Sequence, residues 1–124
     1  MDENILLHAS ELERRMQELS NNLEFIDSKI NELEQFHENL SSLKNWKDKE
    51  MLSPLGKGVY LKTSLIEKEL FVEVGSGIVV KKNLSETQKI VEEQIKRIKE
   101  ARISVLLELE NTKKEFDSIL SIIK

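Results

Sequence analysis

The sequence predicts an α+β fold, in which a long antiparallel coiled-coil hairpin of two helices is joined by a small body of two β-hairpins. Three observations predict it. The four glycines and the one proline of this 124-residue chain all fall between residues 54 and 77. The segments on either side space their apolar residues alternately three and four apart, as coiled-coil helices do. The stretch between them alternates its side chains with the period of two that is typical of strands.

The composition limits the class of protein. Charged residues make up 34% of the chain and aromatic residues 5%, which argues against a large globular core and favours a coiled coil. The net charge of −4 comes without any basic block, which argues against nucleic acid as a partner. There is no cysteine, and the acidic N-terminus does not resemble a signal peptide. Because no segment reaches the ~20 apolar residues of a membrane span, we expect a cytoplasmic protein without membrane contact.

Residues 1–50 are expected to form the first coiled-coil segment, with a helix of roughly 45 residues and about 70 Å. Its apolar residues define a seam, the stripe along which two helices of a coiled coil touch. The seam residues are Ile5, Ala9, Leu12, Met16, Leu19, Leu23, Ile26, Ile30, Leu33 and Leu40. His37 takes a further seam position, and from there the apolar stripe drifts to Phe36 and Leu43, which would alter the local winding.

Residues 84–124 repeat this plan. Ser85 and Gln88 have the spacing of a capping box, in which each side chain accepts a backbone N–H at the start of a helix. The seam residues are Val91, Ile95, Ile98, Val105, Leu109, Phe116, Ile119 and Ile123. Arg102 and Thr112 interrupt the apolar spacing, and a polar seam residue can fix the register of a coiled coil. Because one chain carries two seams, each can bury the other, and the coil needs no partner chain.

Residues 51–83 are the expected β body. Glycine pairs at positions 56 and 58 and at positions 75 and 77 predict two tight turns, and therefore four short strands in two hairpins. We expect Gly75 and Gly77 to supply a positive φ or a close approach of backbone in the second hairpin. Two hairpins cannot bury a face by themselves, and they expose sheet edges. The same segment of another subunit is the simplest partner for those edges.

Two stretches of this body, PLGKGVYLKTSL (residues 54–65) and ELFVEVGSGIVVKKN (residues 69–83), resemble the archaeal-type alpha class of prefoldin subunits. The Pro-Leu-Gly entry and the Val-Gly-x-Gly turn before a Val-rich strand carry the resemblance. The order helix, two hairpins, helix is similar to the alpha class along the whole chain, whereas beta-class subunits have one hairpin. The helical arms match by pattern alone.

The resemblance implies an ATP-independent co-chaperone. Two alpha-class and four beta-class prefoldin subunits join through their hairpins into a double β-barrel, and the coiled coils hold non-native proteins (clients) at their free ends. The clients then pass to a group II chaperonin. The residues expected to make the oligomer contacts are Pro54, Leu55, Val59, Leu61, Val72, Val74, Gly75, Gly77, Ile78 and Val80.

Apolar residues in excess of the seam gather where both helices end. We expect these residues to bind clients: Ile5, Leu6, Leu7, Phe116, Ile119, Leu120, Ile122 and Ile123, with a smaller share from Ile103, Leu106 and Leu107. A contiguous apolar patch at an exposed end favours an interaction surface, because terminal turns are usually polar. The alternative, that these residues only close the end of the coil, stays open.

No pattern of residues predicts an enzyme or a cofactor. The glycine pairs lack the third glycine and the following helix of a nucleotide-binding loop. The two histidines, His8 and His37, do not have the spacing of metal ligands. An alternative from a different class is a structural coiled-coil subunit, which would use the same β body to build scaffolds or filaments without holding clients.

Overall fold

The structure is a computed structural model that describes residues 3–46, 50–65 and 69–123. Its elements are α1 (Glu3–Ser42), a 3₁₀ turn (Leu43–Asn45), β1 (Glu50–Gly56), β2 (Val59–Ser64), β3 (Leu70–Gly75), β4 (Ile78–Lys82) and α2 (Leu84–Ile123). The two long helices pack as a hairpin, with the two antiparallel β-hairpins between them in the chain. This confirms the predicted fold class. The chain divides into two compact units, residues 1–33 with 94–124, and residues 34–93.

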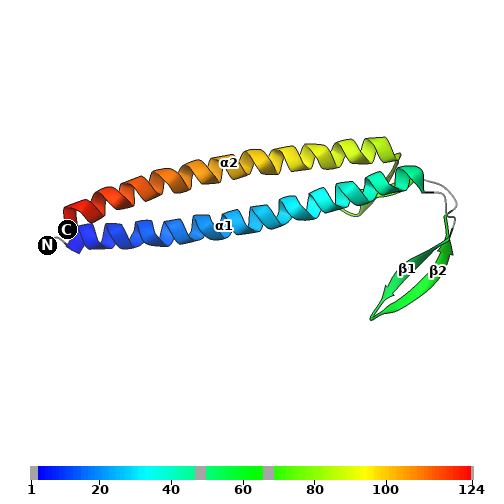
Figure 1. Cartoon of the computed structure of the whole chain (residues 1–124), viewed down its shortest axis with the longest axis horizontal. Coiled ribbons are helices and arrows are strands. Elements are labelled where there is room, and N and C mark those ends of the chain that lie inside the picture. Colours follow the sequence, from blue (N-terminus) through cyan, green and yellow to red (C-terminus); the bar gives the residue numbers. More distant parts are fainter. Residues whose placement is uncertain (1–2, 47–49, 66–68, 124) are drawn as a thin grey trace. The chain divides into compact units, whose positions relative to one another are not determined.

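In the first unit, the N-terminal part of α1 lies beside the C-terminal part of α2, so that the outer ends of both helices meet (Figure 1). Seam residues fill the contact: Leu19 is almost completely buried, and Ala9, Leu12 and Ile30 are buried around it. Thr112 is buried as well, and its hydroxyl donates to the carbonyl oxygen of Glu108 over 2.7 Å. The polar seam residue is therefore satisfied within its own helix.

The helix α1 ends at Ser42 after 40 residues, a little earlier than the sequence predicts. Two serines mark this end. Ser41 donates its hydroxyl to the carbonyl oxygen of His37, and Ser42 donates to that of Asn39. Such bonds compete with the helical pattern and satisfy carbonyls that a helix end leaves open. The sequence analysis places the end of the first coiled-coil segment at residue 50. Residues 47–49, just before that boundary, lie outside the described part of the chain.

The helix α2 begins with a capping box, but not the predicted one. The backbone N–H of Glu86 donates to Oδ1 of Asn83 over 2.8 Å, and the N–H of Asn83 donates to Oε1 of Glu86 over 3.4 Å. Asn83 is therefore the N-cap and Leu84 the first helical residue. The prediction that Ser85 caps this helix was wrong, because Ser85 already lies inside the helix.

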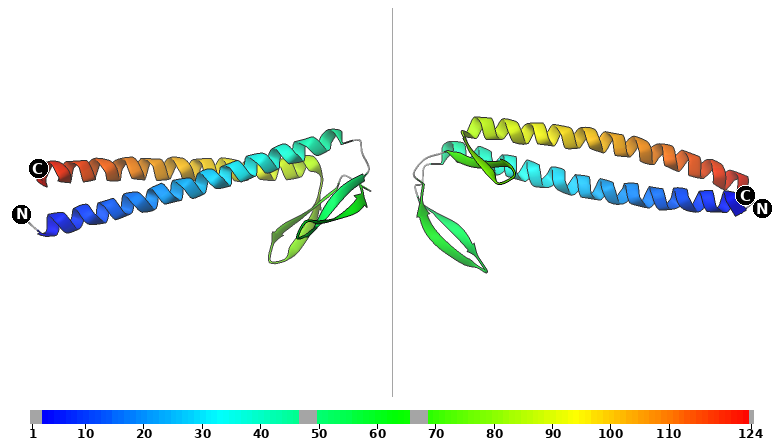
Figure 2. Two further views of the ribbon diagram at one scale, coloured as in Figure 1. Left: turned by 60° about the horizontal axis from the view of Figure 1, so that its bottom comes forward. Right: turned by 180° about the vertical axis from the view of Figure 1, so that it is seen from behind.

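Each β-hairpin is a two-stranded antiparallel sheet, and Figure 2 shows them as two separate ribbons. Both turns are of type I′, with positive φ at the two central residues: 51° and 78° at Lys57 and Gly58, and 50° and 76° at Ser76 and Gly77. The predicted positive φ of Gly77 is confirmed. An irregularity in pairing precedes each turn, between Pro54 and Gly56 and between Glu73 and Gly75. The two hairpins are thus built on one local plan.

Candidate functional site

The first candidate surface is the body of two hairpins. In the second hairpin, Val72 pairs directly with Val80, so their side chains share one face of the ribbon. Both are half-buried, whereas Val74 and Ile78 near the turn are exposed. An apolar face that stays partly in water on the separate chain is typical of a surface that a partner covers.

The first hairpin exposes its predicted residues still further. Leu55 is the extra residue where the register of β1 and β2 shifts, and it is 67% exposed. Val59 and Leu61 on β2 are each more than half exposed. Pro54 is exposed in β1 and pairs with Tyr60. Proline cannot donate to a neighbouring strand, which agrees with its position near an edge or a bulge.

The sequence reasoning missed four further apolar residues of the hairpins. These are Leu52, Tyr60, Phe71 and Val79, all more than half exposed, with Phe71 at 71%. Their alternation with the predicted residues was the available signal. Each hairpin also has an ion pair: Lys62 contacts Glu50 at 3.1 Å in the first hairpin, and Lys81 contacts Glu69 at 2.6 Å in the second. Both hairpins thus carry apolar side chains on both faces.

The backbone of the hairpins has unused pairing capacity. Within the described residues each sheet contains two strands, so each strand has a neighbour on one side only. The other side presents N–H and C=O groups in the geometry of an open sheet edge. Such an edge can pair with a strand of another chain, and its hydrogen bonds impose direction and register on that partner.

The second candidate surface, which we call the coil end, consists of residues 5–7 of α1 and residues 116–123 of α2. The structure divides its apolar residues into two sets. Half-buried between the helices are Ile5, Phe116, Ile119, Leu120 and Ile123. Leu6, Leu7 and Ile122 are exposed, the last two at 63% and 69%. One set closes the coil, and the other is available to a ligand.

The three remaining candidates lie further along α2. Ile103 and Leu107 are 58% and 55% exposed, and Leu106 is 37% exposed. Their spacing of three and four residues places them together on one face of the helix. Phe25 on α1 is also an exposed apolar residue, and the sequence reasoning did not select it; Nζ of Lys29 lies 5.5 Å from the centroid of its ring.

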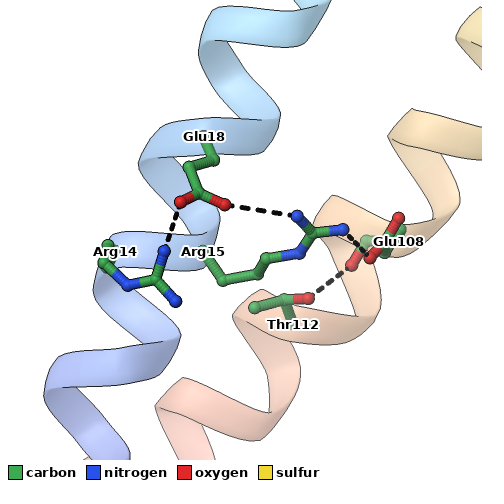
Figure 3. A network of polar contacts seen from close by, with 5 residues as sticks. All are labelled: Arg14, Arg15, Glu18, Glu108 and Thr112. Atoms are coloured by element: carbon green, nitrogen blue, oxygen red, sulfur yellow. Dashed lines mark hydrogen bonds and ion pairs between the residues drawn. The ribbon is translucent and has the colours of Figure 1, made fainter.

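Ion pairs join the two helices near the coil end. His8 contacts Glu115 at 3.1 Å, and Arg15 donates to Glu108 at 2.5 Å. Figure 3 shows Arg15 between Glu108 of α2 and Glu18 of its own helix, with Arg14 on the other oxygen of Glu18. The bonds to Glu108 and then to Glu18 raise the pKa of Arg15, so this cation stays charged.

Two of the polar residues on the seam, Arg102 and His37, find partners on the opposite helix. Nε of Arg102 donates to Oδ1 of Asp27 over 2.6 Å, and His37 contacts Glu92 at 3.0 Å. In the same unit as His37, the side-chain amide of Gln88 donates to the hydroxyl of Ser41 over 2.9 Å. These contacts fix which residues of α1 face which residues of α2.

Nothing in the described ranges has the geometry of a catalytic or metal centre. Among residues 3–46, 50–65 and 69–123, no three His, Asp or Glu side chains gather where they could hold a metal ion. Over the same residues, no helix is long and apolar enough to cross a membrane. The two candidate surfaces are the β body and the coil end.

These features define a class of protein in which a coiled-coil hairpin carries an apolar end and a β body carries open edges. The model of the prefoldin subunit family matches residues 12–124, and the chain belongs to that family. Prefoldins are chaperones that are not enzymes, and their subunits assemble into oligomers. A subunit of filamentous prefoldin from Methanocaldococcus jannaschii, solved by cryo-electron microscopy, has a similar fold. Its TM-score is 0.80 at 21% identity, over 92% of this chain and 96% of that chain. A search of curated proteins found no match.

Proposed function

We propose that this chain is an alpha-class prefoldin subunit that holds non-native proteins at its coil end without ATP. The observation that carries the proposal is the exposure of Leu6, Leu7 and Ile122 where the two helices end. Apart from the terminal turns, the backbone of a helix is satisfied internally, so a client contacts the coil end mainly through side chains. Apolar contact without directional hydrogen bonds suits a ligand of no fixed sequence or shape.

The energy of such contacts supports reversible holding. Burying one side chain of this kind is worth about 1.5–3 kcal/mol, so one coil end supplies a weak site. Several coil ends in one oligomer raise the avidity without a tight individual site. A holder of this kind releases its client once a stronger acceptor takes the apolar segments. We propose that this acceptor is a group II chaperonin.

The β body is the proposed assembly surface. Four beta-class subunits with two copies of this chain would cover the exposed strands and pair the open edges in a cytoplasmic hexamer. Support comes from the open edges and from the exposure of Val59, Leu61, Val74 and Ile78. Assembly would also gather the coil ends that avidity requires.

Two measurements on one preparation test this function. The chain is co-expressed with a beta-class prefoldin subunit, and native mass spectrometry determines the stoichiometry. The same sample is then mixed with a denatured enzyme that aggregates on dilution, and light scattering is followed without ATP. We expect a hexamer that suppresses the scattering. A hexamer that leaves the scattering unchanged contradicts client holding, whereas a monomer contradicts the assembly.

A structural role in a filament is the second candidate. It is favoured by the likeness to a subunit of filamentous prefoldin and by the presence of two hairpins with open edges in one chain. A chain with two separate pairing surfaces can add copies without closing a ring. Electron microscopy of the chain alone and of the chain co-expressed with a beta-class subunit separates the two candidates. Filaments of the chain alone favour the scaffold, whereas closed particles that form only with the beta-class subunit favour the hexamer.

A further inference from the structure

We propose that a second client contact is formed by Ile103, Leu106 and Leu107, which we call the side patch. It lies on the same flank of the coil as some residues of the coil end. The two would bind one extended polypeptide segment whose two apolar clusters lie about six residues apart. This inference rests on the proposed client-holding function. It adds what kind of segment is held and where that segment runs.

The ion pairs show that the coil has two different flanks. His8, Arg15, Glu108 and Glu115 each come one residue before a seam residue, and they pair across the coil along one flank. Residues in this position on both helices of an antiparallel coil lie on the same side of the seam. Bonded polar side chains occupy that flank between these four positions, which makes this part of it unsuitable for an apolar segment.

The apolar residues occupy the other flank. Leu6, Leu106 and Leu120 each come one residue after a seam residue, on the side opposite to the pairs that His8 and Arg15 form. Asp27 has the same position after Ile26, so its ion pair with Arg102 lies on this second flank. Leu6 and Leu106 are exposed, and Leu120 is half-buried. Ile103 and Leu107 widen the apolar surface around Leu106 on the outer side of α2. The side patch and part of the coil end are therefore aligned along one flank.

The distance between them sets the length of the segment. Leu106 and Leu120 occupy equivalent heptad positions 14 residues apart. At 1.5 Å per helical residue, the separation is about 21 Å. An extended polypeptide covers about 3.3 Å per residue, so about six residues bridge the two contacts.

The helix surface between Leu106 and Leu120 is charged. The two apolar contacts are therefore separate and do not form one continuous apolar stripe. Glu110, Lys113, Lys114 and Asp117 are all exposed there. A segment that is apolar throughout would desolvate these charges without pairing them. A segment with a polar middle leaves them in water. An extended non-native chain with two separated apolar clusters therefore fits this flank.

Fluorescent peptides test the spacing. Each carries two identical Leu-Phe-Leu clusters joined by a Gly/Ser spacer of two, six or twelve residues, and a fourth peptide has one cluster. Kd for the assembled oligomer is measured by fluorescence anisotropy. We expect the six-residue spacer to bind at least about tenfold tighter than the one-cluster peptide, and the two-residue spacer to give no such gain because it cannot span both contacts.

Two variants locate the effect. Ile103→Ser with Leu107→Ser removes apolar surface from the side patch, and Phe25→Ser removes a comparably exposed apolar residue of α1 outside it. Circular dichroism checks that both remain helical. The gain of the six-residue spacer should disappear in the first variant and remain in the second. The proposal is overturned if the six-residue spacer still binds tighter than the one-cluster peptide after Ile103→Ser with Leu107→Ser. The second cluster would then bind another part of the coil or another subunit.

The failures of the two proposals are distinguishable. If the parent oligomer suppresses aggregation but binds all two-cluster peptides equally, the side patch is not a client contact and the proposed function stands. If the parent neither suppresses aggregation nor binds any peptide, the client-holding function fails and this inference fails with it.

Discussion

The β body and the coil end both expose apolar side chains, but they differ in what their backbones offer. Val59 and Phe71 lie on strands whose outer edges have no neighbouring strand in the described chain. Leu7 and Ile122 lie on helices whose N–H and C=O groups mostly bond within the helix, although the last turn of α2, which contains Ile122, leaves carbonyl oxygens open. A partner of the body must therefore match direction and register, whereas a partner of the coil end needs only apolar surface.

This difference shows how one chain can be selective at one place and tolerant at another. Selectivity follows from hydrogen bonds that are costly to leave unmade when an interface buries them. Tolerance follows from contacts that have no preferred direction and are worth little individually. The same residue types, Leu, Ile and Val, serve in both places, so composition alone does not separate the two surfaces.

The largest effect is expected from a charge in the body. Val72→Asp places a carboxylate on the face that Val72 shares with Val80. Because an unpaired buried charge is unfavourable, we expect the oligomer to be lost while circular dichroism still shows full helicity. Val72→Thr, which keeps the β-branched shape, is the control and should retain most of the assembly. Native mass spectrometry measures the oligomeric state. An intact hexamer with Val72→Asp would contradict the proposed role of the β body in assembly.

The turn of the second hairpin should show the next largest effect. Gly77 has a φ of 76°, and a Cβ added there meets no heavy atom within 4 Å. The cost of Gly77→Val is therefore conformational, on the order of 1–3 kcal/mol for a β-branched residue at positive φ. We expect weaker assembly, measured as a higher dissociation constant of the oligomer. Gly77→Asn should assemble better than Gly77→Val, since Asn tolerates this region. Equal assembly of both variants would mean that the turn does not govern the strands.

At the coil end, the two sets of residues should behave differently. Leu7→Ser with Ile122→Ser changes the two most exposed residues and should reduce aggregation suppression with little change in melting temperature. Ile119→Ala changes a half-buried seam residue and should lower the melting temperature instead. If both variants lose stability and neither loses client holding, the coil end only closes the coil. Light scattering and thermal unfolding on the same samples provide the comparison.

The smallest effect is expected from the ion pairs. Arg15→Gln removes a contact between the helices, whereas Arg14→Gln removes one within α1. Exposed pairs contribute little and are screened by salt. We expect Arg15→Gln to lower the melting temperature slightly more than Arg14→Gln at low ionic strength, with the difference vanishing in high salt. A large drop that persists in high salt would show that Arg15 supports the fold through packing.

The sequence predicts the helices and strands because the period of apolar residues and the places of glycine and proline are local signals. It does not predict the N-cap, because Asn83 with Glu86 and Ser85 with Gln88 fit the same capping pattern two residues apart. The choice depends on where β4 ends, at Lys82. Nor does it predict that Arg102 reaches Asp27, 75 positions away, because the register between two helices is a tertiary property.

The coil end shows a second limit of the sequence. Spacing separates Ile119 on the seam from Ile122 beside it, but the extent to which Leu120 is covered depends on how the other helix lies against it. The second faces of the hairpins were missed for a related reason. Alternation assigns Tyr60 and Phe71 to a face, and only the structure shows that these faces are exposed.

We propose that assembly and client holding belong to different parts of the chain. Deleting residues 115–124 tests it most directly, with oligomeric state and aggregation suppression measured on one sample. The deletion removes Ile122 and the partner of His8 but leaves all four strands. We expect an intact oligomer whose suppression of aggregation is abolished or sharply reduced. An intact oligomer with undiminished suppression, or a chain that no longer assembles, would contradict it.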